Sequence, residues 1–358
     1  MSDPRRELEC VYQAALAAVN GRQAVASALA ASPIPPPGPF HLLAIGKAAG
    51  AMANGVVDIR AADVAGGLVI TRVGYEDPGL PERIPVRQLV AAHPVPDSRS
   101  LAAGDALVDY LQCAPAHARF LFLISGGASS LVERPTGRRD PATIARLNEW
   151  LLASGLDITR MNAVRKAVST IKGGRLARWL RGRRADGLLI SDVPGDDPAV
   201  IGSGLLAADR GADHDAQRPS GVPPDLEPAP PPPSADDAVF ANVHLQIVAS
   251  NAIARRAAVD AARSRGWSVR TADALLTGEA EALGRQVAES LLQGPTGMFV
   301  MGGEPTVTLP ARPGRGGRMQ TLALSAAGRL AGSDCLLLAA GTDGADGPGE
   351  DAGAIVDG

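Results

Sequence analysis

Short apolar runs alternate with longer amphipathic stretches along the first two thirds of the chain. The runs are continuous rather than alternating, which is typical of parallel strands buried on both faces. They cover residues 41–45, 67–71, 89–92, 120–124 and 188–190. Stretches with helical periodicity follow them, at residues 48–57, 99–111, 141–153 and 160–181. This rhythm predicts βαβ units and therefore an α/β fold built on a doubly wound sheet.

The ends of this region are marked by proline. One helix is expected over residues 5–31, followed by an irregular Pro-rich connector at 32–39. Residues 218–237 are Pro-rich without apolar periodicity, which predicts an extended, mobile linker. We therefore expect an N-terminal α/β domain at 1–217, a linker at 218–237 and a C-terminal α/β domain at 238–358.

The C-terminal region repeats the same pattern on a smaller scale. Helices are expected at residues 251–265 and 280–292. Strands are expected at residues 245–249, 267–271, 298–301, 306–309 and 336–340. No internal repeat at a short fixed period is visible.

Composition narrows the class of protein. Hydrophobic residues make up 46% of the 358 residues, so a full core can be buried, and the net charge is −3. No basic stripe or aromatic platform is present, which argues against nucleic-acid binding. No signal-type segment and no run of about 18 apolar residues is found, so we expect a cytoplasmic protein without a membrane span. The three cysteines are far apart and suggest neither a disulfide framework nor a zinc site.

Lysine is rare in this chain. Only Lys47, Lys166 and Lys172 are lysines among the 35 basic residues. A codon bias toward arginine explains the excess, but a retained lysine can mark a place where the wide guanidinium does not fit. All three lie in or beside segments that have functional features of their own.

Glycine-rich turns follow two of the expected strands. Ligands of open α/β sheets bind at the carboxyl ends of strands, where exposed backbone N–H groups favour phosphate. The first turn is Gly46-Lys47-Ala48-Ala49-Gly50, which lacks the Walker A spacing. The second follows the strand FLFLI and predicts an anion-binding nest. Its candidate ligand-binding residues are Ser125, Gly126, Gly127, Ser129 and Ser130.

A carboxylate follows the strand at 188–190. Asp192 lies where phosphotransferases place a group that binds Mg²⁺ or accepts the proton of the substrate hydroxyl, so it is a candidate catalytic residue and a candidate metal ligand. Upstream, Asn162, Lys166 and Ser169 share one face of the expected helix, opposite Val164, Val168 and Ile171. That polar face is either a binding face or an ordinary solvated one. Lys172, Gly173 and Gly174 follow it and interrupt the helical pattern.

Further candidates lie in other loops. Glu304 follows a glycine pair after a strand, and Arg318 ends a glycine-rich basic loop. Arginines of this kind stabilise transferring phosphoryl groups. Asp343 lies in the turn TDGADG, whose spacing does not match a calcium loop and instead suggests a carboxylate near Mg²⁺ or substrate. For His93, in the loop HPVPDS, a structural and a functional role are equally open.

Nine segments taken in order resemble the ATP-dependent glycerate 2-kinases of the MOFRL type. They are AIGKAAGAM, HPVPD, ISGGASSL, VRKAVSTIKGGRLA, ISDVPGDD, GSG, GGEPTV, GRGGRMQ and GTDGADGP. The resemblance extends from about residue 5 to the end of the chain. It implies two Rossmann-like α/β domains with a catalytic cleft between them, and transfer of the γ-phosphoryl group of ATP, with Mg²⁺, to the 2-hydroxyl of D-glycerate. It also implies catalytic roles for Lys47, Asp192 and Arg318.

The sequence departs from the family pattern at several places. Met319 and Thr321 replace an Asn and a Glu, and Leu205 replaces a Pro after the GSG turn. Family members continue for several tens of residues beyond the position of Gly358, which leads us to expect an incomplete C-terminal domain. The oligomeric state stays open, with a homodimer as one candidate.

Two other functions remain as alternatives. One is a nicotinamide-dependent hydroxypyruvate reductase, although no GxGxxG turn with an acidic residue about 20 positions later follows a strand. The other is a non-catalytic protein that binds a phosphorylated sugar acid.

Overall fold

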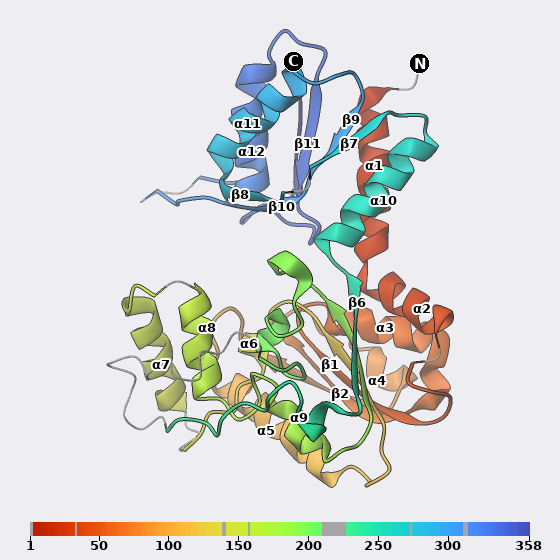
Figure 1. The fold of residues 1–358 in the computed structure, drawn as a ribbon, viewed down its shortest axis with the longest axis vertical. Coiled ribbons are helices and arrows are strands. Elements are labelled where there is room, and N and C mark those ends of the chain that lie inside the picture. The colour runs from red at the N-terminus through yellow and green to blue at the C-terminus, as the bar shows by residue number, and fades with distance from the viewer. Residues whose placement is uncertain are drawn as a thin grey trace. The chain divides into compact units, whose positions relative to one another are not determined.

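The structure is a computed structural model of the 358-residue chain. It describes residues 3–32, 34–137, 141–156, 158–209, 227–272, 274–310 and 314–358. The chain divides into two compact units (Figure 1). The first, Asn20–Ser250, is called the sheet unit below. The second joins Met1–Val19 to Asn251–Gly358 and is called the terminal unit.

The sheet unit is built on one six-stranded parallel sheet in the order β3-β2-β1-β4-β5-β6. Its strands are β1 (Phe40–Ile45), β2 (Val64–Arg72), β3 (Val86–Ala91), β4 (Phe120–Ile124), β5 (Ala185–Ile190) and β6 (Val243–Ala249). The predicted α/β fold with a doubly wound sheet is confirmed. Because β2 lies on one side of β1 and β4 on the other, the chain changes direction between β1 and β4, which is where such sheets bind ligands.

Helices cover both faces of this sheet. The helices of the sheet unit are α2 (Gly21–Ala31), α3 (Ala49–Arg60), α4 (Leu80–Arg83), α5 (Ser98–Cys113), α6 (Ala128–Leu131), α7 (Pro141–Ala153), α8 (Ile158–Ala167) and α9 (Leu176–Leu180). Alternate residues of β1 enter two separate cores. Leu43 and Ile45 pack with residues of α5 and α9, whereas Leu42 and Ala44 pack with residues of α2 and α3. All four are fully buried, as the continuous apolar run predicted.

Two helices of the sheet unit pack on each other beside the sheet. α7 and α8 lie side by side in Figure 1, and Leu147 and Leu151 contact Val164 and Val168. The predicted helix over residues 160–181 is wrong as a single element. It ends at Ala167, and Gly173 and Gly174 adopt positive φ angles of 60° and 78° before α9 begins.

The terminal unit contains helices and three two-stranded ladders. Its helices are α1 (Pro4–Val19), α10 (Asn251–Ser264), α11 (Ala280–Leu292) and α12 (Arg318–Leu330). Its strands are β7 (Val269–Thr271), β8 (Leu276–Glu279), β9 (Met298–Val300), β10 (Gly303–Thr306), β11 (Leu336–Ala340) and β12 (Gly353–Asp357). β7 pairs with β9 and β8 with β10 in parallel, and β11 pairs with β12 in antiparallel fashion. The strand expected at 306–309 is instead β10, which ends at Thr306.

The division into units differs from the expected domain boundaries at both ends. The single helix expected at 5–31 is broken at Asn20, whose side chain accepts hydrogen bonds from the backbone of Arg22 and Gln23 and so begins α2. α1 packs on α10 through small apolar residues, Ala15 and Ala258 among them, and therefore belongs to the terminal unit. β6, expected to open the C-terminal domain, pairs with β5 instead. The second boundary thus lies after Ser250.

Part of the predicted linker is packed against the sheet unit. The backbone of Ala229 donates to the carbonyl of Ala167 at 2.7 Å, and the guanidinium of Arg175 donates to the carbonyl of Pro230 at 2.7 Å. Arg178 donates to the carbonyl of Pro231 at 2.8 Å. Residues 227–231 are therefore held in place, contrary to the expectation of a mobile linker. Residues 218–226 lie outside the described part of the chain.

Candidate active site

The turns after β1 and β4 are joined by backbone hydrogen bonds. The N–H of Lys47 donates to the carbonyl of Gly126 at 2.9 Å, and the N–H of Ser125 donates to the carbonyl of Ile45 at 3.0 Å. A Cβ on Gly46 would lie 2.1 Å from Oγ of Ser125, so a side chain there would separate the two turns. The two glycine motifs of the sequence are thus one structure, located at the point where the sheet changes direction.

Asp192 and His93 reach the same place from β5 and from the loop after β3. A Cβ on Gly126 would lie 2.2 Å from Oδ2 of Asp192, and a Cβ on Gly127 would lie 2.8 Å from Cδ2 of His93 and 3.2 Å from Cγ of Lys47. The two glycines therefore separate a carboxylate on one side from a lysine and an imidazole on the other. The structure brings Lys47 and Asp192 to one turn, together with His93, whose role the sequence left open.

The hydroxyl groups of the predicted nest point into the protein. Ser125 is buried and its Oγ accepts a hydrogen bond from the N–H of Ala48 at 3.1 Å, just before α3. Oγ of Ser129 lies 2.7 Å from Oγ of Ser203, and Oγ of Ser130 donates to the carbonyl of Gly127 at 3.0 Å. These three serines shape the turn. What the turn offers a ligand is the backbone of Gly126 and Gly127, whose N–H groups donate to no residue in the described ranges.

The charge at this turn is predominantly positive. Lys47 is exposed, and its ammonium makes no hydrogen bond or ion pair with the described residues. Burial lowers the pKa of His93 below its usual value, and the charges of Lys47 and Arg72 lower it further. The imidazole is therefore neutral at pH 7, with two cations close enough to affect it. Such a site attracts anionic ligands.

Lys172 is not part of this turn. Its side chain is wholly buried and forms an ion pair with Glu133, which is itself 3% exposed. Burial lowers the pKa of Lys172, and Glu133 opposes that change. Because the ammonium is enclosed, the structure gives Lys172 a structural contact in place of the expected contact with a ligand.

The other residues predicted from this segment are also held by the protein. Lys166 forms an ion pair with Asp209 at 2.9 Å and donates to the carbonyl of Ala199 at 3.1 Å. Asn162 accepts a bond from Arg165 at 3.4 Å. The N–H groups of Gly173 and Gly174 donate to the carbonyls of Ser203 and Gly204. The predicted polar face of the helix is therefore a network of internal contacts, neither a free binding face nor a solvated one.

The remaining predicted residues belong to the terminal unit. Arg318 is the first residue of α12, and its Nη1 lies 3.0 Å from Oε1 of Glu304. Asp346, which the sequence reasoning did not single out, is 3% exposed and accepts the N–H groups of Met319 and Gln320 at 3.0 and 2.7 Å. It caps the helix that begins with Arg318. Asp343 is exposed in the turn after β11.

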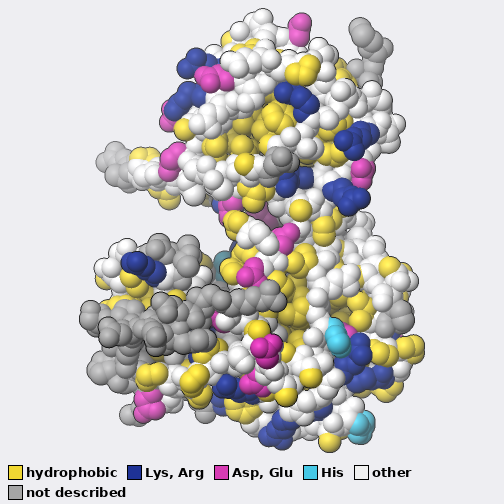
Figure 2. Space-filling view, viewed as in Figure 1, with side chains coloured by type: hydrophobic (Ala, Val, Ile, Leu, Met, Phe, Trp, Pro, Cys, Tyr) yellow, Lys and Arg dark blue, Asp and Glu magenta, His cyan; other side chains and the backbone are white. Residues whose placement is uncertain are grey.

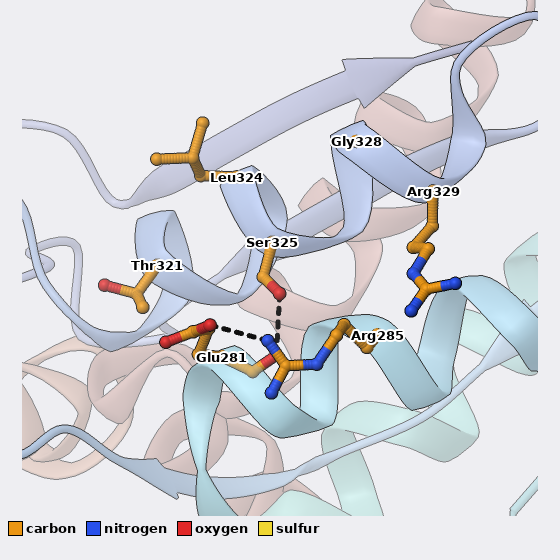
Figure 3. A pocket seen from close by; sticks show the side chains of 7 residues that line it. All are labelled: Glu281, Arg285, Thr321, Leu324, Ser325, Gly328 and Arg329. Atoms are coloured by element: carbon orange, nitrogen blue, oxygen red, sulfur yellow. Dashed lines mark hydrogen bonds and ion pairs between the residues drawn. The ribbon is translucent and has the colours of Figure 1, made fainter.

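A surface pocket of the terminal unit lies away from these residues. A pocket of about 550 Å³ runs between α11 and α12 and contains none of the predicted site residues (Figure 3). In Figure 3, Arg285 points toward Glu281, and Oγ of Ser325 donates to the carbonyl of Glu281 at 2.6 Å. On the face shown in Figure 2, basic and acidic side chains are interspersed and form no basic stripe.

In the described ranges no helix is long and apolar enough to cross a membrane. No group of three or more His, Cys, Asp or Glu side chains that could hold a metal ion is found in that same part of the chain.

Comparison with known proteins identifies the family. Residues 7–219 match the domain of unknown function DUF4147, and residues 297–358 match the MOFRL family. A protein of Agrobacterium vitis provisionally named a hydroxypyruvate reductase is 37% identical over 98% of this chain and 82% of its own length. A protein of Pyrococcus horikoshii named glycerate 2-kinase is 34% identical over 90% of this chain and 76% of its own.

A solved structure supports the same family assignment. The crystal structure of glycerate kinase from Thermotoga maritima superposes with a TM-score of 0.83 at 30% identity, covering 99% of this chain and 87% of that one. Fold, order of motifs and sequence identity agree over nearly the whole chain. The chain therefore belongs to the family that combines a DUF4147 domain with a MOFRL domain, the family of the MOFRL-type glycerate 2-kinases.

Proposed function

We propose that this protein is a glycerate 2-kinase that transfers the γ-phosphoryl group of ATP to the 2-hydroxyl of D-glycerate. The observation that carries the proposal is the turn at which Lys47, His93, Gly126, Gly127 and Asp192 meet. It offers backbone N–H groups and a positive charge to an anion, and one carboxylate to a hydroxyl proton. Relatives named glycerate 2-kinase support the same chemistry.

The roles follow from the chemistry of phosphoryl transfer, which requires positioning and charge neutralisation more than covalent catalysis. The carboxylate of glycerate binds at residues 125–130, mainly through backbone N–H groups, with the help of Lys47. Asp192 orients the 2-hydroxyl and accepts its proton as the oxygen attacks the γ-phosphorus. Arg318 neutralises charge on the phosphoryl group. These assignments are proposals for the active form of the protein.

Mg²⁺ fits this proposal as the ion that accompanies ATP. Magnesium in kinases is usually held by one or two carboxylates together with the phosphates of the nucleotide, and not by an all-protein cage. The absence of a cluster of three such side chains in the described ranges is compatible with that mode, and Asp192 is the carboxylate that would contact the ion. When bound, Mg²⁺ would neutralise part of the phosphate charge.

The test is ADP release with ATP, Mg²⁺ and D-glycerate, followed by identification of the product. The proposal expects ADP formation that depends on glycerate and yields 2-phosphoglycerate. Formation of 3-phosphoglycerate, or ADP release that does not depend on glycerate, would contradict it.

A second candidate is a hydroxypyruvate reductase, favoured by the provisional names of two relatives and by a strand order shared with dinucleotide-binding sheets. Against it, Ala48 stands where the dinucleotide turn has its second glycine, the residue that lets the backbone approach the pyrophosphate. Oxidation of NADH or NADPH by hydroxypyruvate without ATP would favour this alternative.

A further inference from the structure

Arg72 lies at the carboxyl end of β2, and its charge is unpaired among the described residues. Its guanidinium lies 3.8 Å from the ring centroid of Tyr75. Nε is buried without a hydrogen bond, and the residue makes no ion pair with any other described residue. Buried N–H groups of arginine are normally bonded, so this one indicates a missing acceptor.

The place of Arg72 connects it to the candidate active site. β2 is the neighbour of β1 in the sheet, and Arg72 is paired in register with Ala91, two residues before His93. The charge of Arg72 acts on the imidazole of His93, which in turn lies against Gly127. Arg72 therefore faces the same end of the sheet as Lys47 and adds a second cation there.

The nearby carboxylates do not supply the missing acceptor. Asp77 is held by Arg83 at 2.6 Å and by Asn54 at 2.8 Å. Asp192 lies against Gly126, whereas His93 and Lys47 lie against Gly127. No described residue is therefore bonded to the guanidinium of Arg72, which leaves it available to a bound anion.

We propose that Arg72 acts together with the backbone N–H groups of residues 125–130 in binding the carboxylate of the hydroxy-acid substrate, through its Nε–Nη edge, and makes the site specific for acids; this inference rests on the proposed kinase function. The guanidinium is a planar fork that matches a carboxylate with two parallel hydrogen bonds, and stacking on Tyr75 fixes its plane. Lys47, a single point charge, does not supply that geometry. Arg72 is a substrate-binding residue in this account, with Tyr75 as its positioning residue.

The experiment compares D-glycerate with its neutral amide, D-glyceramide, in the wild-type protein, Arg72→Ala, Arg72→Lys and the control Arg87→Ala. Arg87 is an exposed arginine at the other end of the neighbouring strand β3. Arg72→Ala should lower kcat/KM for glycerate about 10- to 100-fold, mainly through KM, and leave kcat/KM for glyceramide unchanged. Arg72→Lys should recover part of the loss, and Arg87→Ala should behave as wild type.

Three kinetic outcomes would overturn the inference. Equal losses for acid and amide would indicate a structural role, and a rise confined to the KM of ATP would assign Arg72 to nucleotide phosphate. Unchanged kinetics in Arg72→Ala would show that Arg72 has no role in substrate binding. Should wild type show no glycerate-dependent ADP release, the proposed function fails. Calorimetry of D-glycerate binding without nucleotide then tests the role of Arg72 separately. The role would be wrong if the wild-type protein did not bind D-glycerate, or if Arg72→Ala bound it with unchanged affinity.

Discussion

Gly126 and Asp192 are in contact because Gly126 has no side chain. A Cβ at position 126 would lie 2.2 Å from Oδ2 and 3.0 Å from Cγ of Asp192. The two residues are 66 positions apart in the sequence, on loops that follow the neighbouring strands β4 and β5. The position of the proposed proton acceptor is therefore set partly by a glycine on another loop.

Gly126→Ala should reduce turnover by about 100-fold, because a misplacement of about 1 Å at a reacting group can cost that much. The stability of the fold should change little, since the displaced atoms are the end of an exposed, flexible side chain. Steady-state kinetics and thermal unfolding check both statements. Gly79→Ala, where a Cβ would meet its nearest atom at 3.6 Å, is the matched control.

A double-mutant cycle decides whether the methyl group acts through Asp192. In an Asp192→Ala background, Gly126→Ala should cause little further loss of turnover. If the loss of turnover in the double variant equalled the product of the two single losses, Gly126 would act by a route that does not involve Asp192.

Lys47→Ala and Asp192→Asn should each lower kcat by about 10²- to 10⁴-fold, since each removes a proposed charge or proton acceptor from the transition state. Both residues are exposed, so the thermal unfolding midpoint should stay close to that of the wild type. Asp109→Asn, an exposed carboxylate on α5, is the control for removing a charge. If either variant kept near wild-type turnover in the ATP and glycerate assay, that residue's role would be wrong.

Lys172→Met should destabilise the protein by about 3–5 kcal/mol, because it leaves the buried carboxylate of Glu133 without its partner. Glu133→Leu combined with Lys172→Met should recover much of that loss, since the pair is then replaced by apolar groups. Urea unfolding monitored by circular dichroism measures both. Activity measured below the unfolding transition should be retained in the double variant, and its loss would point to a contact of Lys172 with substrate.

Asp346→Ala should destabilise the start of α12 by about 0.5–2 kcal/mol, the usual range for loss of a capping side chain. The carboxylate accepts the N–H groups of Met319 and Gln320, which directly follow Arg318. Hydrogen exchange should become faster at these two amides. Exchange rates unchanged at positions 319 and 320 would show that the cap is dispensable.

The pKa of His93, followed by NMR, should lie below 6.5 in the free protein and rise when D-glycerate binds. Burial and the charges of Lys47 and Arg72 lower it, and a bound anion would offset those charges. His41 is the control, because its pKa is also lowered by burial but it lies at the opposite end of β1. An unchanged pKa of His93 with glycerate bound would place the anion elsewhere.

The lowered pKa of His93 also makes the free energy of unfolding depend on pH. An unfolded chain protonates His93 near pH 6.5, before the folded protein does. The unfolding free energy should therefore fall as the pH drops from about 6.5 toward the lower folded-state pKa, and be unaffected by His93 above that range. His93→Asn should reduce this slope in pH-dependent unfolding measurements.

The sequence by itself determined the strands of the sheet unit and most of the motifs at their ends. Continuous apolar runs are a local property of the chain, and those at residues 41–45 and 120–124 became β1 and β4. Lys47 and Asp192 were found because they directly follow such runs. Arg72 follows a run in the same way and could have been found by the same rule.

Tertiary structure alone decided which of these ends meet and which residues are enclosed. Pairing of β1 with β4, and of β5 with β6, joins segments far apart in the chain, and local periodicity carries no information on such partners. The buried ammonium of Lys172 is paired with Glu133, 39 residues earlier in the chain. The hydroxyl of Ser129 points inward because it bonds with the hydroxyl of Ser203. A residue's type states what it can do chemically, whereas the side chains that surround it decide whether a ligand can reach it.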